Sequence, residues 1–184
     1  MISQAHLMDN LARERVFDEL CKLLPVISAT DLSRFAPVLC RVIPELTPMV
    51  GYDQKNRHHI HDLYTHTALV EHCPGDLILR WAALLHDIGK PASMTMGEDG
   101  QAHYHGHAAV SAEMADAVLR RLKAPTALRE QVVFLVAHHG QKGLVGRQHR
   151  ALGQIRDLGR GDGADGQAEI LARQAAENVP VRDA

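Results

Sequence analysis

The chain has few cysteines, few aromatic side chains and almost no net charge. Its three cysteines lie far apart in the 184 residues and form no C-x-x-C pair, which argues against a redox role and is typical of reduced thiols in a cytoplasmic protein. Aromatic residues make up 4% of the sequence, and the formal net charge is −2. Both values disfavour a surface that binds nucleic acid by base stacking or by strong positive charge.

Long apolar runs are also missing. No segment approaches the roughly 20 apolar residues that a transmembrane helix needs, and the N-terminus lacks the basic and apolar stretches of a signal peptide. We therefore expect a cytoplasmic protein without a membrane partner. The length of 184 residues and the hydrophobic fraction of 46% predict one domain with its own core and a short appendage.

What the chain does contain is helical periodicity. Apolar residues recur at spacings of three and four, and strict alternation of apolar and polar residues is absent, so the sequence predicts an all-α fold. Residues 92–105 are predicted to form a loop, and the glycines within residues 159–166 weaken the last predicted helices. Helices are expected at about 10–24, 30–43, 59–71, 76–87, 106–122, 125–139, 148–158 and 164–177.

The dipeptide His86-Asp87 ends a predicted helix that Asp76 caps and that is otherwise strongly apolar. An imidazole or a carboxylate that is buried without a partner costs several kcal/mol. A divalent cation bound to both side chains is the simplest compensation, because neutral imidazole and carboxylate suit borderline and hard ions. The dipeptide therefore predicts a metal site at the end of this helix.

The predicted helix at residues 59–71 brings more candidate ligands. His59, Asp62 and His66 lie at positions i, i+3 and i+7, which share one helix face. An ion pair between Asp62 and His66 at the surface would explain part of this spacing equally well. Both interpretations stay open.

Three further histidines lie at helix ends. His107 opens one predicted helix, and His138-His139 ends another after five consecutive apolar residues. Taken singly, each is better explained as a hydrogen-bonded core or helix-terminal histidine. Taken together, they favour a convergence of imidazoles on one site in a small helical domain. His105 lies in the predicted loop and could reach a substrate from there.

These residues occur in an order that resembles a known family. His66, His86-Asp87 and Asp165 resemble the H…HD…D signature of the HD superfamily of metal-dependent phosphohydrolases. The chain also resembles one branch of that superfamily, the bacterial tRNA nucleotidyltransferases (CCA-adding enzymes), in their HD region and in the helical segment before it. The residues that carry this resemblance are 15–20, 42–46, 51–67, 84–91, 103–107 and 111–115. The nucleotidyltransferase head of that branch has no counterpart in this sequence, so nucleotide addition is not implied.

The resemblance, which covers about residues 12–170, implies a fold and a ligand set. The implied fold is an all-α, HD-domain-like helical bundle at residues 51–178, preceded by an N-terminal helical leader at residues 1–50. The family's four metal-ligand positions are matched by His66, His86, Asp87 and Asp165. Positions that hold a second ion in binuclear relatives are matched by His107, His138 and His139.

Two features depart from the family's pattern. His107 is followed by Ala108 where the family has a glutamate, which removes a carboxylate near the second ion. Asp165 lies among glycines that should loosen its helix, so Asp162 remains an alternative residue for closing the site.

The resemblance implies metal-assisted hydrolysis of a nucleotide or RNA-end phosphoester, by a 2′,3′-cyclic phosphodiesterase, 2′-nucleotidase or phosphatase reaction. One or two divalent ions (Mg, Mn, Ni, Co, Fe or Zn) would activate a bound water. Asp87 would act as the general base, and Lys90, which follows the HD-x-G-K pattern, would neutralise charge on the phosphate. The candidate substrate-binding residues are His59, Asp62, Lys90 and His105.

A non-catalytic HD module that binds tRNA or a protein partner is the alternative hypothesis. The glycines around Asp165 and the missing glutamate after His107 favour it, whereas the retained H…HD…K pattern favours the enzyme. A homodimer is compatible with either hypothesis.

Overall fold

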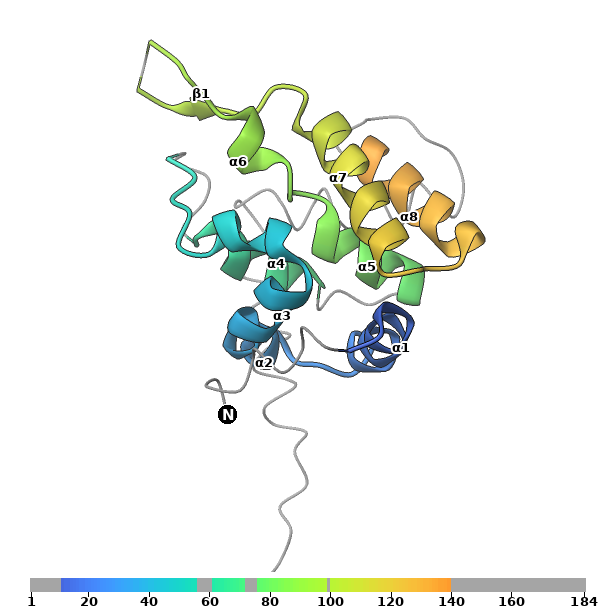
Figure 1. Cartoon of the computed structure of the whole chain (residues 1–184). Helices are drawn as coiled ribbons and strands as arrows, with labels where there is room; N and C mark the ends of the chain where they lie inside the picture. The colour runs from blue at the N-terminus through green and yellow to red at the C-terminus, as the bar shows by residue number, and fades with distance from the viewer. Residues whose placement is uncertain (1–10, 56–60, 72–75, 99, 140–184) are drawn as a thin grey trace, which may run out of the picture.

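The computed structural model describes residues 11–55, 61–71, 76–98 and 100–139, which form a helical body with one short hairpin (Figure 1). This confirms the predicted all-α class. Among the described residues, no helix is both long and apolar enough to span a bilayer. The elements in chain order are α1 (Arg13–Leu23), α2 (Ala29–Arg34), α3 (Ala36–Val42), the 3-10 helix η2 (Pro44–Met49), α4 (Leu63–Glu71), α5 (Leu77–Leu85), α6 (Lys90–Ser93), β1 (Thr95–Met96), β2 (Ala102–His103), α7 (His107–Arg121) and α8 (Thr126–His138).

Helix α5 is central to the hydrophobic core. Every residue from Leu79 to Leu85 is buried, and the helix contacts both α4 and α8. It begins at the predicted N-cap, where the carboxylate of Asp76 accepts a hydrogen bond from the main-chain nitrogen of Leu79 at 3.0 Å. Helices α7 and α8 run side by side next to it (Figure 1). This packing encloses the end of α5, where His86 and Asp87 follow.

The helices within residues 11–50, the described part of the predicted leader, contribute to the same core. Phe17 of α1 stacks on Trp81 of α5, with ring centroids 5.6 Å apart. Glu45 of η2 accepts two hydrogen bonds from the guanidinium of Arg121 in α7, at 2.6 and 2.7 Å. Buried residues of the leader and of the later helices form one continuous hydrophobic cluster. The packing around α5 therefore depends on the leader.

Removing the hydroxyl of Tyr64 should weaken this packing. The hydroxyl donates to the main-chain oxygen of Leu32 in α2 across 3.2 Å, in a buried contact between the leader and α4. Tyr64→Phe deprives that oxygen of its donor, so we expect the free energy of unfolding to fall by about 1 kcal/mol. Urea unfolding followed by circular dichroism measures the change, and an unchanged midpoint would contradict the expectation.

The prediction of one helix over residues 30–43 is wrong in one respect. The structure has two helices there, α2 and α3, which meet at Phe35. Pro37 has no N–H to donate, and in a continuous helix its ring would clash with the carbonyl of Ser33. Helix α2 begins after Ser28, whose hydroxyl oxygen accepts a hydrogen bond from the main-chain nitrogen of Asp31 at 3.1 Å.

Part of the segment predicted as a loop, residues 92–105, forms a hairpin. Strands β1 and β2 pair antiparallel, with Thr95 opposite His103, and the hairpin projects from the helical body (Figure 1). The main-chain nitrogen of Ala102 donates to the main-chain oxygen of Lys55 at 3.2 Å. This bond fixes the hairpin beside residues that precede α4 and so places the chain that leads into α7.

Two of the three cysteines fall in the described part of the chain. Cys21 and Cys40 are half-buried free thiols packed against the hydrophobic cluster. Burial raises the pKa of each thiol, which keeps the sulfur protonated and unreactive. The structure thus gives neither of them the character of a redox residue.

Candidate metal centre

The candidate centre begins where α5 ends. The chain turns at residues 86–89 before α6 starts at Lys90. His86 and Asp87 are each 2% exposed, so both side chains lie inside the helical body. The Nδ1 of His86 donates to the main-chain oxygen of Ala83 at 2.7 Å. In the neutral ring this leaves a lone pair on Nε2, which is the form that binds a metal.

One oxygen of Asp87 defines a first group of ligand atoms. Its Oδ2 lies 3.0 Å from the Nε2 of His86 and 3.7 Å from the Nε2 of His66, which comes from α4. The Nζ of Lys90 lies 2.8 Å from the same oxygen. The ligand atoms of His66, His86 and Asp87 all lie within 4.8 Å of one another, and the three residues are buried. This group could hold a divalent cation.

The other oxygen of Asp87 belongs to a second group. Its Oδ1 lies 3.4 Å from the Nε2 of His107, at the start of α7, and 3.7 Å from the Nε2 of His139, just after α8. The two Nε2 atoms are 3.1 Å apart, and each ring donates from Nδ1 at 2.7 Å to a main-chain oxygen, that of Tyr104 or Val136. Two neutral rings would therefore direct lone pairs at each other. A cation bound between them would remove this repulsion.

Asp87 is negatively charged in this setting. Burial alone would raise its pKa, but the Coulombic interactions with His86 and Lys90, together with hydrogen bonds from His107 and His139 when these rings carry a second proton, hold the pKa well below its usual range. An ionised carboxylate shared by two pairs of histidines suits one divalent ion, or two ions that it bridges. The donor set therefore fits the kind of metal that the sequence predicts.

The side chains of His138 and His139 lie in different surroundings. His138 donates from Nδ1 to the main-chain oxygen of Phe134 at 2.7 Å and stacks on the Phe134 ring, with centroids 4.3 Å apart. It belongs to neither group of ligand atoms among the described residues. Successive helical residues differ in direction by about 100°, and of these two histidines it is His139 whose Nε2 faces Asp87.

Asp62 caps α4, which begins at Leu63, later in the sequence than predicted. Its Oδ1 accepts hydrogen bonds from the main-chain nitrogens of Tyr64 and Thr65 at 3.0 and 3.2 Å, and its Oδ2 accepts from the Thr65 hydroxyl at 2.5 Å. These are the bonds of an N-cap, so the carboxylate stabilises the helix that carries His66. Three predicted site residues lie outside the described part of the chain: His59, Asp162 and Asp165.

The two remaining candidate substrate-binding residues lie in contrasting places. Lys90 is 7% exposed and is held against Asp87. His105 is exposed on the turn before α7, where its ring stacks on that of His103 with centroids 5.6 Å apart. Lys90 is thus part of the centre, whereas His105 contacts the hairpin.

Two residues that the sequence did not single out contact Lys90. The Oε1 of Gln54 accepts a hydrogen bond from the Nζ of Lys90 at 3.0 Å, and the ring centroid of Tyr104 lies 5.6 Å from the same Nζ. The hydroxyl of Tyr104 donates to the main-chain oxygen of Gln54 at 2.8 Å. Burial and the neighbouring Tyr52 raise the pKa of Tyr104, so its hydroxyl keeps the proton it donates. Neither residue had a periodic or spacing signal in the sequence, although both lie in segments that carry the family resemblance, 51–67 and 103–107.

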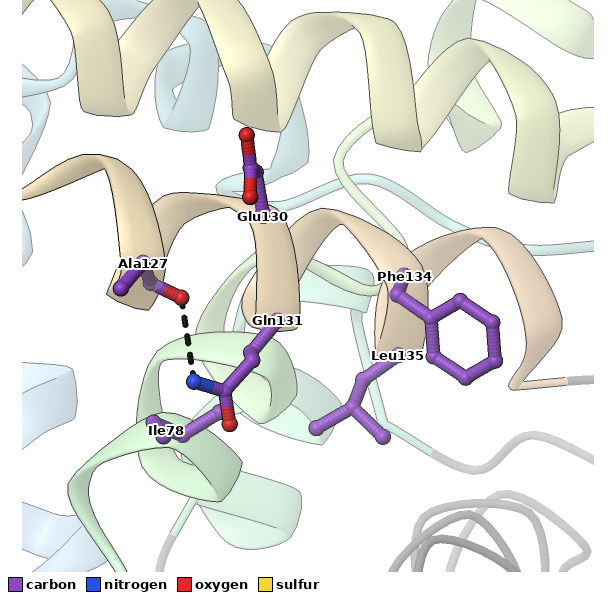
Figure 2. A pocket seen from close by; sticks show the side chains of 6 residues that line it. All are labelled: Ile78, Ala127, Glu130, Gln131, Phe134 and Leu135. Carbon is purple, nitrogen blue, oxygen red and sulfur yellow. Dashed lines mark hydrogen bonds between the residues drawn. The ribbon is translucent and has the colours of Figure 1, made fainter.

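A surface pocket between α5 and α8 has different chemistry (Figure 2). Inside it the side-chain amide of Gln131 donates to the main-chain oxygen of Ala127 at 3.1 Å. The residues that line it include one carboxylate and no histidine, so it is not a candidate metal or catalytic site. They are Ile78, Ala127, Glu130, Gln131, Phe134 and Leu135.

Comparison with known proteins agrees with the motifs and the geometry. Residues 65–173 match the family model described as "HD domain". The chain is 38% identical over 144 residues to the multifunctional CCA protein of Aromatoleum aromaticum, an alignment that covers 72% of this chain and 34% of that protein. It is 38% identical over 138 residues to the A-adding tRNA nucleotidyltransferase of Deinococcus radiodurans, covering 70% and 32%. It is also 38% identical over 146 residues to the CC-adding tRNA nucleotidyltransferase of Thermus thermophilus, covering 74% and 33%.

These matches confirm the predicted resemblance to the HD region of tRNA nucleotidyltransferases. The chain spans about a third of the length of these curated relatives. The similarity therefore concerns that region and leaves the remaining two thirds of each relative without a match.

Proposed function

The chain belongs to the HD domain family, a superfamily of metal-dependent hydrolases, and on that basis we propose that it hydrolyses phosphoesters of nucleotides or RNA ends. The observation that carries the proposal is the buried carboxylate of Asp87, which two pairs of histidines and the ammonium of Lys90 surround. Such a buried charged cluster is a poor way to stabilise a core. It is typical of a site that binds a metal and a charged substrate.

In the proposed reaction Asp87 and the two pairs of histidines would hold a divalent metal ion. The ion would supply Lewis acidity, which lowers the pKa of a bound water and polarises a phosphoryl oxygen. Lys90 keeps its ammonium beside the same carboxylate, where it stabilises negative charge that develops on the phosphoryl oxygens.

The role of Asp87 as general base meets a physical objection. A carboxylate whose pKa lies well below its usual range is a weak base, and general bases work best when their pKa is near the operating pH. We therefore assign Asp87 to holding the cation and to orienting the attacking water through a hydrogen bond.

The relatives are named for tRNA and for CCA addition, so RNA ends are the substrates to test first. The protein is stripped with a chelator, reloaded with Mg, Mn, Ni or Co, and incubated with 2′,3′-cyclic AMP, 2′-AMP and p-nitrophenyl phosphate. Turnover of at least one substrate that His86→Ala abolishes would support the proposal. Stoichiometric metal binding without any turnover would instead support a non-catalytic module that binds tRNA or a protein partner.

The adjacent histidines at the end of α8 offer a matched pair of variants. His139→Ala removes a ligand atom that faces Asp87, so we expect the affinity for Mn²⁺ to fall by about 10- to 100-fold or more. His138→Ala removes an equally large imidazole that stacks on Phe134, and the affinity should stay unchanged. Isothermal titration calorimetry measures both, and an equal loss in the two variants would contradict this placement.

A further inference from the structure

Gln54 is enclosed within the centre although it ligates nothing in either histidine group. The residue is 1% exposed, and its main-chain oxygen accepts a hydrogen bond from the hydroxyl of Tyr104 at 2.8 Å. The Nζ of Lys90, which can only donate, lies 3.0 Å from one end of the Gln54 amide. That end must therefore be the oxygen Oε1, and the amide nitrogen Nε2 must be the other end.

The Nε2 of Gln54 is buried and has no hydrogen-bond partner in the part of the chain that the structure describes. A buried amide is normally satisfied at both ends, because an unpaired donor loses its hydrogen bonds to water without replacement. If the only role of Gln54 were to accept from Lys90, an acceptor for Nε2 would still be needed for stability. The unpaired donor thus points to an acceptor that a ligand brings.

Lys90, beside Gln54, has one ammonium N–H for which the described residues offer no hydrogen-bond acceptor. Its ammonium carries three N–H groups, and the described partners that accept from it are Asp87 Oδ2 and Gln54 Oε1, at 2.8 and 3.0 Å. The Nζ of Lys90 and the Nε2 of Gln54 lie close together, since Nε2 shares its carbon with the oxygen that Lys90 contacts. Two adjacent donors, one of them charged, suit an anionic oxygen.

The position of these donors suits a ligand that approaches from solvent. The side chain of His107 is 24% exposed, the highest value among the residues that contact Asp87. The main-chain oxygen of Tyr104 accepts from the Nδ1 of His107, and the ring of Tyr104 faces the Lys90 ammonium. Tyr104 therefore connects the more exposed His107 to the place where Lys90 and Gln54 lie.

We propose that Gln54 is a substrate-binding residue whose Nε2 donates to the phosphoryl oxygen that Lys90 also contacts. The ligand class is a phosphate ester or inorganic phosphate. The inference rests on the proposed phosphohydrolase function for the identity of the substrate. The anion-binding site itself, formed by the Nε2 of Gln54 and the Nζ of Lys90, does not depend on that function.

The decisive variant is Gln54→Glu. It keeps the shape of the side chain and an acceptor for Lys90, while it replaces the donor Nε2 with a carboxylate oxygen that repels an anion. We expect the KM for the hydrolysed phosphoester to rise by about 10- to 100-fold with a smaller change in kcat, since a hydrogen bond to a charged group is lost. Gln54→Leu, which removes both ends of the amide, should raise KM similarly.

Inorganic phosphate provides a readout that does not depend on activity. Calorimetric titration of phosphate into metal-free and Mn²⁺-loaded protein should give binding to the wild type that is at least tenfold weaker in Gln54→Glu, with Mn²⁺ affinity not reduced. Gln131→Glu makes the same substitution on the exposed face of α8 and should change neither KM nor phosphate affinity.

The outcomes separate the two proposals. Phosphate binding that depends on Gln54, in a protein that hydrolyses no phosphoester, would overturn the proposed function and support the anion-binding site. Hydrolysis with the same KM and the same phosphate affinity in the wild type and both Gln54 variants would overturn the anion-binding site alone. Absence of phosphate binding to the wild type with and without Mn²⁺ would also overturn it.

Discussion

Asp87→Asn should abolish metal binding in both histidine groups at once. Each group has two histidines, and Asp87 supplies one oxygen to each, so a single substitution removes the shared anionic ligand. The neutral amide keeps the size of the side chain but no longer compensates a divalent charge. We expect no stoichiometric metal after reconstitution with Mn²⁺, and a loss of phosphoester hydrolysis of roughly 10³-fold or more. Elemental analysis and initial rates measure the two effects.

Two single-group variants are the control for this shared role. His66→Ala removes a ligand from the first group only, and His107→Ala removes one from the second only. Each should reduce metal binding less than Asp87→Asn does, because the other group keeps its three ligands. An Asp87→Asn protein that binds as much Mn²⁺ as the wild type would show that the carboxylate is not the common ligand.

The parts of the fold that follow from local pattern could be predicted from the sequence. The cap at Asp76 and the apolar run after it define α5, because a capping carboxylate and helical spacing are both readable from neighbouring residues. The break at Phe35 was missed although Pro37 is visible in the sequence. A proline in the first turn of a helix is tolerated, so the sequence alone does not say whether it lies inside one helix or starts the next.

The choice between His138 and His139 was available in the sequence, from the apolar stripe of α8. Val132, Leu135 and Val136 are all buried, and continuing their i, i+3, i+4 spacing to i+7 gives His139, which is 6% exposed. His138 lies one position off this stripe. The apolar run alone suggests that both histidines lie near the core. The helical phase of its buried residues identifies His139 as the histidine that faces the core.

The contacts of Gln54 and the hairpin could not be predicted in this way. Gln54 meets Lys90 across 36 positions of sequence, from a segment without regular structure. The hairpin has two residues in each strand, too few to show alternation, and Ala102 is tied to Lys55 by a long-range main-chain bond. Both depend on tertiary packing, which composition and spacing do not encode in a readable form.

Gly89→Ala should destabilise the protein and displace one half of the centre. Gly89 has φ −86° and ψ −7°, which an alanine can adopt, so the backbone angles do not require glycine. The available space does require glycine, because an added Cβ would lie 2.6 Å from the main-chain nitrogen of Ser111 and 3.0 Å from the main-chain oxygen of His107. We expect the free energy of unfolding to fall by about 3 kcal/mol, the upper part of the range for overpacking, with weaker Mn²⁺ binding as α7 and His107 shift away from Asp87.

Ser111→Ala separates this clash from the hydrogen bond at the same contact. The main-chain nitrogen of Gly89 donates to the hydroxyl of Ser111 at 2.9 Å, and Ser111→Ala removes that acceptor without adding volume. Its cost should be about 1–2 kcal/mol, smaller than that of Gly89→Ala, and it should leave Mn²⁺ affinity near the wild-type value because α7 need not move. Guanidinium unfolding gives the stabilities and calorimetry the affinities. Equal effects of the two variants on both quantities would mean that the lost hydrogen bond, and not the close approach of α7, explains the glycine.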